Sequence, residues 1–207
     1  QQLYNLSVRS EVKTMLKRLF IAIDPEPALL DTIFRLISTI KREYPVEGMR
    51  YTAPQNLHLT LLFLGDTDEN LIPKIGNGLD EICQNFTEFD LEFANLGAFP
   101  SRHNPRILWL GVNNPEPVSV LAKAIIHDSG LVVAPEKDQF SPHLTLGRVA
   151  ENARGVSGEV FSRLFSKLGN VKAGSTRIRE VLLYQSVLKP GGPEYTVLSR
   201  HALKKLC

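Results

Sequence analysis

The tetrapeptide HLTL occurs twice in this chain, at 58–61 and again at 143–146. From this composition, a second copy of a tetrapeptide that begins with a given histidine has odds of roughly one in a thousand. Each copy stands in a short apolar run typical of a β-strand, and each half of the chain also contains a segment with helical periodicity. The repeat therefore predicts an internal duplication, with two similar lobes that each contain one copy.

The alternation of side chains along a strand separates the two kinds of residue in the repeat. Residues i and i+2 point to the same face, so His58 and Thr60 share one face and the leucines share the other. His143 and Thr145 repeat this arrangement in the second copy. The leucines are expected in the core of each lobe. If a pseudo-twofold axis relates the lobes, two histidines and two threonines converge on one cleft.

The remaining pattern favours an α+β fold, because the expected strands adjoin one another without strict βαβ alternation. Asp24 and Pro25 are expected to begin the first helix as its N-cap and first residue. Phe63 and Trp109 are expected in the core. Helices are expected from Asp24 to about residue 44 and over 69–85, 117–128 and 159–168. Strands are expected over 18–23, 49–52, 57–64, 88–97, 106–112, 143–149, 178–188 and 195–201.

Composition excludes several classes of protein. With 43% hydrophobic residues in 207, the chain has enough apolar surface to exclude a wholly disordered protein, and no apolar run approaches the roughly 20 residues of a membrane span. The net charge of +2 disfavours a duplex-binding module. An anionic substrate would therefore have to be bound by a few positive groups concentrated in one site. Cys83 and Cys207 lie far apart, which is typical of reduced thiols in a cytoplasmic protein.

The first fourteen residues are polar and carry no clear period, whereas Met15 begins the segment MLKRLFIAID, which contains the first expected strand. We therefore expect residues 1–14 to be an extension, or a segment added outside the natural gene product. Residues 15–207 are expected to form a single bilobal domain. A closed two-lobed chain needs no protein partner, so a monomer is expected.

Paired histidines and threonines suit displacement at phosphorus. One imidazole can accept a proton from the nucleophile while the other protonates the leaving group, and the hydroxyls can donate to oxygens that gain charge. Arg148 could bind the phosphate, but strict alternation turns it away from His143, so this role requires a β-bulge or strand end. A metal site is disfavoured, because no third ligand stands at a metal-binding spacing from either histidine.

Longer segments extend the match beyond the repeat. They are RLFIAI at 18–23, PQNLHLTLLFLG at 54–65, PRILWLGV at 105–112, SPHLTLGR at 141–148 and LLYQSVLKPGGPEY at 182–195. The chain resembles the 2H phosphoesterase superfamily, whose signature is two H-x-[ST]-hydrophobic motifs. Within it, the chain is most similar to the RNA 2′,3′-cyclic phosphodiesterases, the LigT-like family also labelled 2′–5′ RNA ligases.

The resemblance implies a bilobal fold with two pseudo-twofold related, mainly antiparallel sheets flanked by helices, and an active site in the cleft between them. It implies metal-independent hydrolysis of a terminal 2′,3′-cyclic phosphate on RNA to a 2′-phosphate, without a cofactor. By position, His58 corresponds to the acid and His143 to the base, although the two near-equivalent motifs could exchange roles. Thr60, Thr145 and Arg148 correspond to the residues that bind the phosphate oxygens.

Two further residues are candidates for substrate binding, Arg50 and Tyr51. Tyr51 departs from the family pattern, which shows Trp after an arginine like Arg50, and this departure concerns substrate stacking more than chemistry. Reversal of the reaction would form a 2′–5′ linkage. Two alternatives stay open: a nucleotide- or RNA-binding module with little turnover, and a 2H enzyme that acts on another cyclic or 2′–5′-linked nucleotide.

Overall fold

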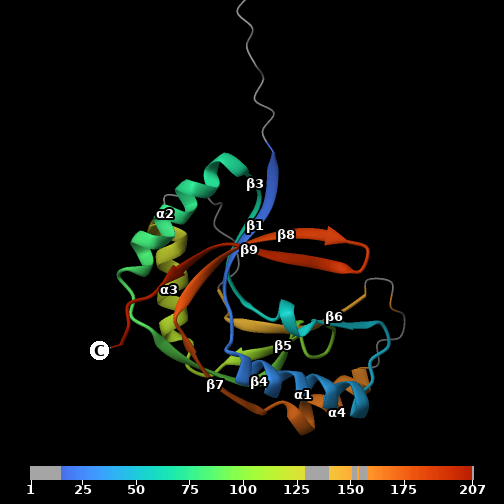
Figure 1. Ribbon diagram of the computed structural model, residues 1–207. Helices are drawn as coiled ribbons and strands as arrows, with labels where there is room; N and C mark the ends of the chain where they lie inside the picture. Colours follow the sequence, from blue (N-terminus) through green and yellow to red (C-terminus); the bar gives the residue numbers. More distant parts are fainter. Residues whose placement is uncertain (1–14, 129–139, 151–152, 154–157, 207) are drawn as a thin grey trace, which may run out of the picture.

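The computed structural model describes residues 15–128, 140–150, 153 and 158–206 (Figure 1). The expected extension at 1–14 lies outside the described residues. Within them the chain forms nine β-strands and four α-helices, arranged in two antiparallel sheets. None of the helices in the described ranges is long and apolar enough to cross a membrane.

The two sheets repeat one arrangement. In the order in which they pair, the first contains β3 (Leu59–Asp68), β1 (Leu16–Ile23), β8 (Glu180–Lys189) and β9 (Gly192–Ala202). The second contains β2 (Met49–Tyr51), β6 (His143–Val149), β5 (Pro105–Val112), β4 (Phe89–Pro100) and β7 (Lys172–Ile178). The order β3-β1-β8-β9 corresponds to β6-β5-β4-β7, so the two copies of HLTL occupy equivalent places. The expected α+β fold with two similar sheets is confirmed.

The two lobes are not the two halves of the sequence. The hairpin β8–β9 at the end of the chain pairs with β1 at its beginning, as Figure 1 shows. In the other direction, β2 from the first half pairs with β6 in the second sheet. The expectation of eight strands was also wrong, because β7 is a mostly polar edge strand that contains Gly174 and has little apolar alternation.

All four expected helices are present. They are α1 (Pro27–Glu43), α2 (Ile72–Cys83), α3 (Glu116–Asp128) and α4 (Gly158–Leu168). The expected start of α1 was wrong by two residues, since its N-cap is Glu26. Asp24 instead accepts a hydrogen bond of 2.6 Å from the Tyr184 hydroxyl of β8.

The leucine faces of both motifs enter one continuous hydrophobic core. Leu59 and Leu61 of β3 belong to the same buried cluster as Leu144 and Leu146 of β6. The expectation of a separate core in each lobe is therefore corrected: the two sheets share their main core. A second, small cluster around Phe20 and Tyr184 lies on the other face of the first sheet.

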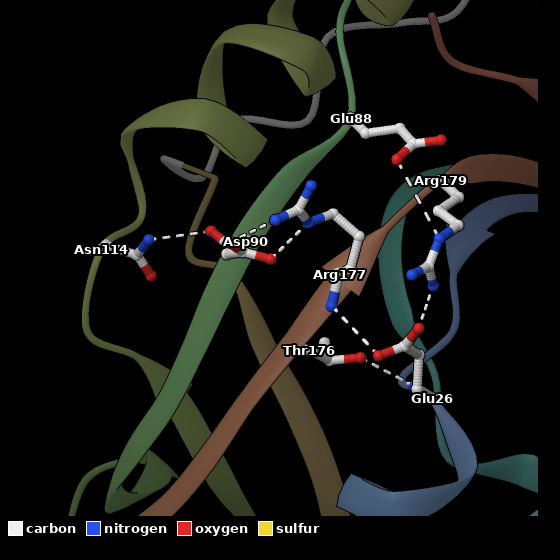
Figure 2. A network of polar contacts seen from close by, with 7 residues as sticks. All are labelled: Glu26, Glu88, Asp90, Asn114, Thr176, Arg177 and Arg179. Atoms are coloured by element: carbon white, nitrogen blue, oxygen red, sulfur yellow. Dashed lines mark hydrogen bonds and ion pairs between the residues drawn. The ribbon is translucent and has the colours of Figure 1, made fainter. Parts of the chain in front are cut away.

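A polar network joins the end of β1 to the second sheet (Figure 2). The Glu26 backbone N–H donates to the Thr176 hydroxyl of β7 at 2.8 Å, and the Glu26 carboxylate binds Arg179. Arg177 of β7 forms a bidentate ion pair with Asp90 of β4, at 2.6 and 2.9 Å. These contacts hold the start of α1 against β7, on which α1 packs.

Candidate active site

Each motif strand contains a β-bulge at the last residue of HLTL. The register of β1 with β3 skips Leu61, and the register of β5 with β6 skips Leu146. A bulge inserts one residue into the alternation, so the side chain two residues beyond it rejoins the face of the histidine. In β6 this brings Arg148 to the same face as His143. The β-bulge that a phosphate-binding role for Arg148 requires is present in β6.

Arg148 is exposed and lies directly opposite Arg50, across the pairing of β2 with β6. Directly opposite side chains share a face, so both candidate arginines face the same way as His143. Among the described residues, neither arginine has a carboxylate within ion-pair distance. Because like charges opposite one another repel, this pair of cations is suited to an anion that binds between or beside them.

Phe63 and Trp109 are not core residues, and those expectations were wrong. Phe63 stands five residues after His58, where the bulge returns it to the histidine face, and its side chain is 52% exposed. Trp109 is half-buried, with its ring 6.0 Å from that of His143. Gly97 makes room for it, because a Cβ at that position would fall 2.1 Å from the indole.

Both histidines are held in the same way. The Nδ1 of His58 lies 2.8 Å from the carbonyl oxygen of Asn56, and that of His143 lies 2.6 Å from the carbonyl oxygen of Ser141. A carbonyl only accepts, so each Nδ1 carries the proton, and Nε2 of the neutral ring has the free lone pair. Within the described part of the chain, neither Nε2 has a hydrogen-bond partner. Two equivalent nitrogens are thus available to take or give a proton.

Aromatic rings enclose each imidazole. His58 lies 4.8 Å from Phe20 and 5.1 Å edge-on to Tyr195, measured between ring centroids. His143 lies 5.1 Å edge-on to Phe99, beside Trp109. The contact of these aromatic rings with the histidines was not expected from the sequence. The sequence does contain a signal for Phe20. In RLFIAI, the alternation of side chains places Phe20 on the face opposite to the leucine and isoleucines of the core.

The two motifs act on each other electrostatically. Burial lowers the pKa of His58 to about 4, and the positive charges of Arg148 and His143 contribute to this shift. Burial also lowers the pKa of His143, again with a contribution from Arg148. Both histidines thus feel the charge of Arg148 from β6, and β6 contacts β3, the strand that directly follows His58. Both shifts favour the neutral form of the imidazole in the free protein.

The threonines of the motifs are half-buried on the same faces. Among the described residues, no hydrogen bond engages the hydroxyl of Thr60 or of Thr145. The Thr145 carbonyl is anchored, since it accepts from the Thr52 hydroxyl at 2.7 Å. No group of three or more His, Cys, Asp and Glu in the described ranges is arranged to hold a metal ion. The site thus offers two imidazoles, two hydroxyls and guanidinium groups.

Tyr51 points away from this site. It neighbours Arg50 on β2, so alternation turns its ring to the core side, where it packs against the main cluster. The Lys41 ammonium of α1 lies 4.9 Å from the ring centroid. The hydroxyl is buried and has no partner among the described residues. A role in substrate contact stays a prediction, and this placement disfavours it.

The chain is similar to a known protein family, to curated relatives and to solved structures. Residues 23–109 match the family model described as LigT like Phosphoesterase. The RNA 2′,3′-cyclic phosphodiesterase of Methanothermobacter thermautotrophicus is 35% identical over 86% of this chain and 95% of its own length. That of Archaeoglobus fulgidus is 31% identical over 86% and 96%.

Solved structures give the same result. The crystal structure of E. coli LigT in apo form superposes with a TM-score of 0.69 at 28% identity, covering 92% of this chain and 99% of that one. The similarity therefore extends over both sheets and both motifs. On this sequence identity and coverage, the chain belongs to the LigT-like phosphoesterase family of the 2H superfamily.

Proposed function

We propose that this protein hydrolyses RNA ends that carry a 2′,3′-cyclic phosphate, leaving a 2′-phosphate. The observation that carries the proposal is the pair of unpartnered Nε2 atoms, one from each motif, beside Arg148. The relatives named RNA 2′,3′-cyclic phosphodiesterase support the reaction class. A further support is that E. coli LigT has been crystallised with 3′-AMP, a nucleotide whose phosphate is attached to the 3′ oxygen of the ribose.

The phosphate is held by hydrogen-bond donors from both motifs. The hydroxyls of Thr60 and Thr145 and the Arg148 guanidinium donate to its non-bridging oxygens, and Arg50 adds positive charge. Each of these interactions strengthens as the oxygens gain charge in the transition state. Because no carboxylate neutralises either arginine among the described residues, the positive charge remains available to the substrate.

Hydrolysis proceeds by in-line attack on phosphorus. His143 Nε2 accepts a proton from a water molecule as the water oxygen bonds to phosphorus. The bond to the 3′ oxygen breaks on the opposite side, and protonated His58 donates its proton to that oxygen. The products are a 3′-hydroxyl and a 2′-phosphate, and the proton gained by His143 returns to His58 through solvent. Neither step uses a metal ion.

The acid role requires His58 to take up a proton on binding, because its pKa in the free protein is about 4. The negative charge of a bound phosphate favours the protonated ring and raises this pKa. Substrate binding at pH 7 is therefore coupled to proton uptake. As the bond to the 3′ oxygen breaks, that oxygen becomes the stronger base and takes the proton from His58.

The terminal base stacks on Phe63. This ring is exposed on the same face as His58, and bases stack on aromatic side chains with little dependence on sequence. Reversal of the reaction would join a 2′-phosphate end to a hydroxyl, but water at about 55 M favours hydrolysis. A monomer in the cytoplasm that needs no cofactor is part of the same proposal and rests on the sequence.

The test uses an RNA oligonucleotide that ends in 2′,3′-cyclic phosphate, incubated with the protein in EDTA. Mass and phosphatase sensitivity identify the product. The wild type should give a 2′-phosphate end, and His58→Ala and His143→Ala should lose most activity. A 3′-phosphate product, dependence on added metal, or full activity in either variant contradicts the mechanism. Binding without turnover would favour the binding-module alternative, and turnover only of 2′–5′-linked nucleotides the other.

A substrate with a different leaving group distinguishes the acid from the base among the two histidines. In a cyclic substrate with sulfur at the bridging 3′ position, the departing thiolate needs no proton. His58→Ala should then recover activity relative to the oxygen substrate, whereas His143→Ala should not. The opposite pattern would exchange the acid and the base.

A further inference from the structure

Arg18 is an arginine of β1 with no partner in the described structure. It lies two residues from Phe20, so it shares the face of that ring and of His58. Its side chain is exposed, and none of the described residues forms a hydrogen bond or an ion pair with it. Asp66 of β3 lies opposite Arg18 but not within ion-pair distance. The neighbouring Lys17, on the other face, is bound to Glu69 at 3.3 Å.

Strand pairing connects Arg18 with a residue of the candidate active site. Arg18 pairs with Ser186 of β8, and Ser186 pairs with Tyr195 of β9. Tyr195 is one of the two rings in closest contact with His58. Burial raises the pKa of the Tyr195 hydroxyl, and the charges of Arg148 and Arg18 both lower it. Tyr195 therefore lies within electrostatic reach of both guanidinium groups.

An aromatic residue accompanies this second cation. Phe63 pairs with Phe20 across β1 and β3, which places the exposed ring next to Arg18 on the same face. A cation for the backbone beside a ring for the base is the combination by which proteins bind single-stranded nucleic acids. Arg148 and the two histidines account for only one phosphate, so Arg18 offers a site for another.

We propose that Arg18 binds the phosphate on the 5′ side of the terminal nucleotide, and that the protein therefore prefers oligonucleotide ends to 2′,3′-cyclic mononucleotides. This inference rests on the proposed function. The direction follows from the chemistry of the substrate. A nucleotide with a 2′,3′-cyclic phosphate is the 3′ end of its chain, so its only other phosphate is attached to its 5′ oxygen. A cyclic mononucleotide with a free 5′-hydroxyl lacks that group.

The test compares adenosine 2′,3′-cyclic phosphate with the dinucleotide ApA that ends in the same cyclic phosphate. For the wild type, kcat/KM should be about 10- to 100-fold higher on the dinucleotide, as expected for one charge-assisted contact. R18Q should lower kcat/KM on the dinucleotide at least 10-fold more than on the mononucleotide. K17Q, on the opposite face of the same strand, should leave both values unchanged.

Salt dependence gives a second readout. Loss of one contact to a single-stranded phosphate should reduce the slope of log KM against log salt for the dinucleotide by about 0.7. Equal losses on both substrates in R18Q, an unchanged salt slope, or no wild-type preference for the dinucleotide would overturn the inference.

Failure of the proposed function gives a different result, namely that the wild type hydrolyses neither substrate. Arg18 is then tested by binding alone. Trp109 is the only tryptophan of the chain and lies beside His143, so its fluorescence can report on the site. Adenosine 2′-phosphate and ApA with a 2′-phosphate end are the two ligands. R18Q should weaken binding of the dinucleotide at least 10-fold more than that of the mononucleotide, and equal weakening refutes the assignment.

Discussion

The low pKa of His58 makes a quantitative prediction about stability. The pKa falls from its ordinary value of 6.5 to about 4 in the folded protein, mainly because the ring is buried. Between these values the unfolded chain binds a proton at His58 that the folded chain does not, so stability is lost as the pH falls through this window. A difference of two and a half pKa units corresponds to about 3.4 kcal/mol in full, and to about 2.5 kcal/mol at pH 4.5.

The variant that tests this is His58→Gln, which retains a polar side chain but cannot titrate. Urea unfolding at pH 7 and pH 4.5 gives the free energy of unfolding of each protein. The decrease between the two pH values should be about 2.5 kcal/mol smaller for the variant than for the wild type. His127→Gln removes an exposed histidine of α3 and should keep the wild-type decrease. Parallel decreases in wild type and His58→Gln would refute the burial argument.

A direct titration completes the test. In NMR spectra, the Cε1 proton signal that disappears in His58→Gln should titrate with a midpoint near pH 4 in the free wild-type protein. Added phosphate should move the midpoint upward, because an anion beside the ring favours its protonated form. A midpoint near 6.5 without ligand, or one that phosphate leaves in place, would contradict the electrostatic description of the site.

Three further perturbations follow from the contacts. Gly97→Ala should displace the Trp109 ring, which shifts the tryptophan emission and lowers activity, whereas Gly158→Ala has open space and should do neither. Arg148→Ala should lower kcat/KM on the cyclic phosphate about 10²- to 10³-fold, and Arg148→Lys should recover part of this loss. An unchanged kcat/KM in Arg148→Ala would show that Arg148 does not stabilise the transition state. Tyr184→Phe removes a hydroxyl donor from a carboxylate and should lower the free energy of unfolding by about 1 to 2 kcal/mol in urea titrations; equal stability means that water replaces this bond.

The paired site was predictable because strand alternation is a local rule. HLTL contains its own division into a polar and an apolar face, and the repeat indicated that two such faces exist. His58, Thr60, His143 and Thr145 lie where the rule predicts. The helices were also predictable, since their apolar periodicity lies within single segments.

The errors about strands and their side chains share one cause, which is that strand pairing is not local. Phe63 and Trp109 were assigned to the core because ideal alternation, or an apolar setting, pointed there. A bulge at Leu61 turns Phe63 to the site, and a glycine on the neighbouring strand accommodates Trp109. Whether a strand bulges depends on the register with its partner, and that partner is distant in the sequence. The strand β7 was missed for the same reason, because its own sequence has little apolar alternation and its pairing partner, β4, is distant in the sequence.

By itself, the sequence determined that two histidines and two threonines stand on polar strand faces in an α+β protein. Only the tertiary structure decided that the lobes interleave, that bulges bring Arg148 and Phe63 beside the histidines, and that Arg18 continues the same face. The physical reason is that a side chain's face follows from its own strand, whereas its neighbours are fixed by hydrogen bonds to strands far away in the chain.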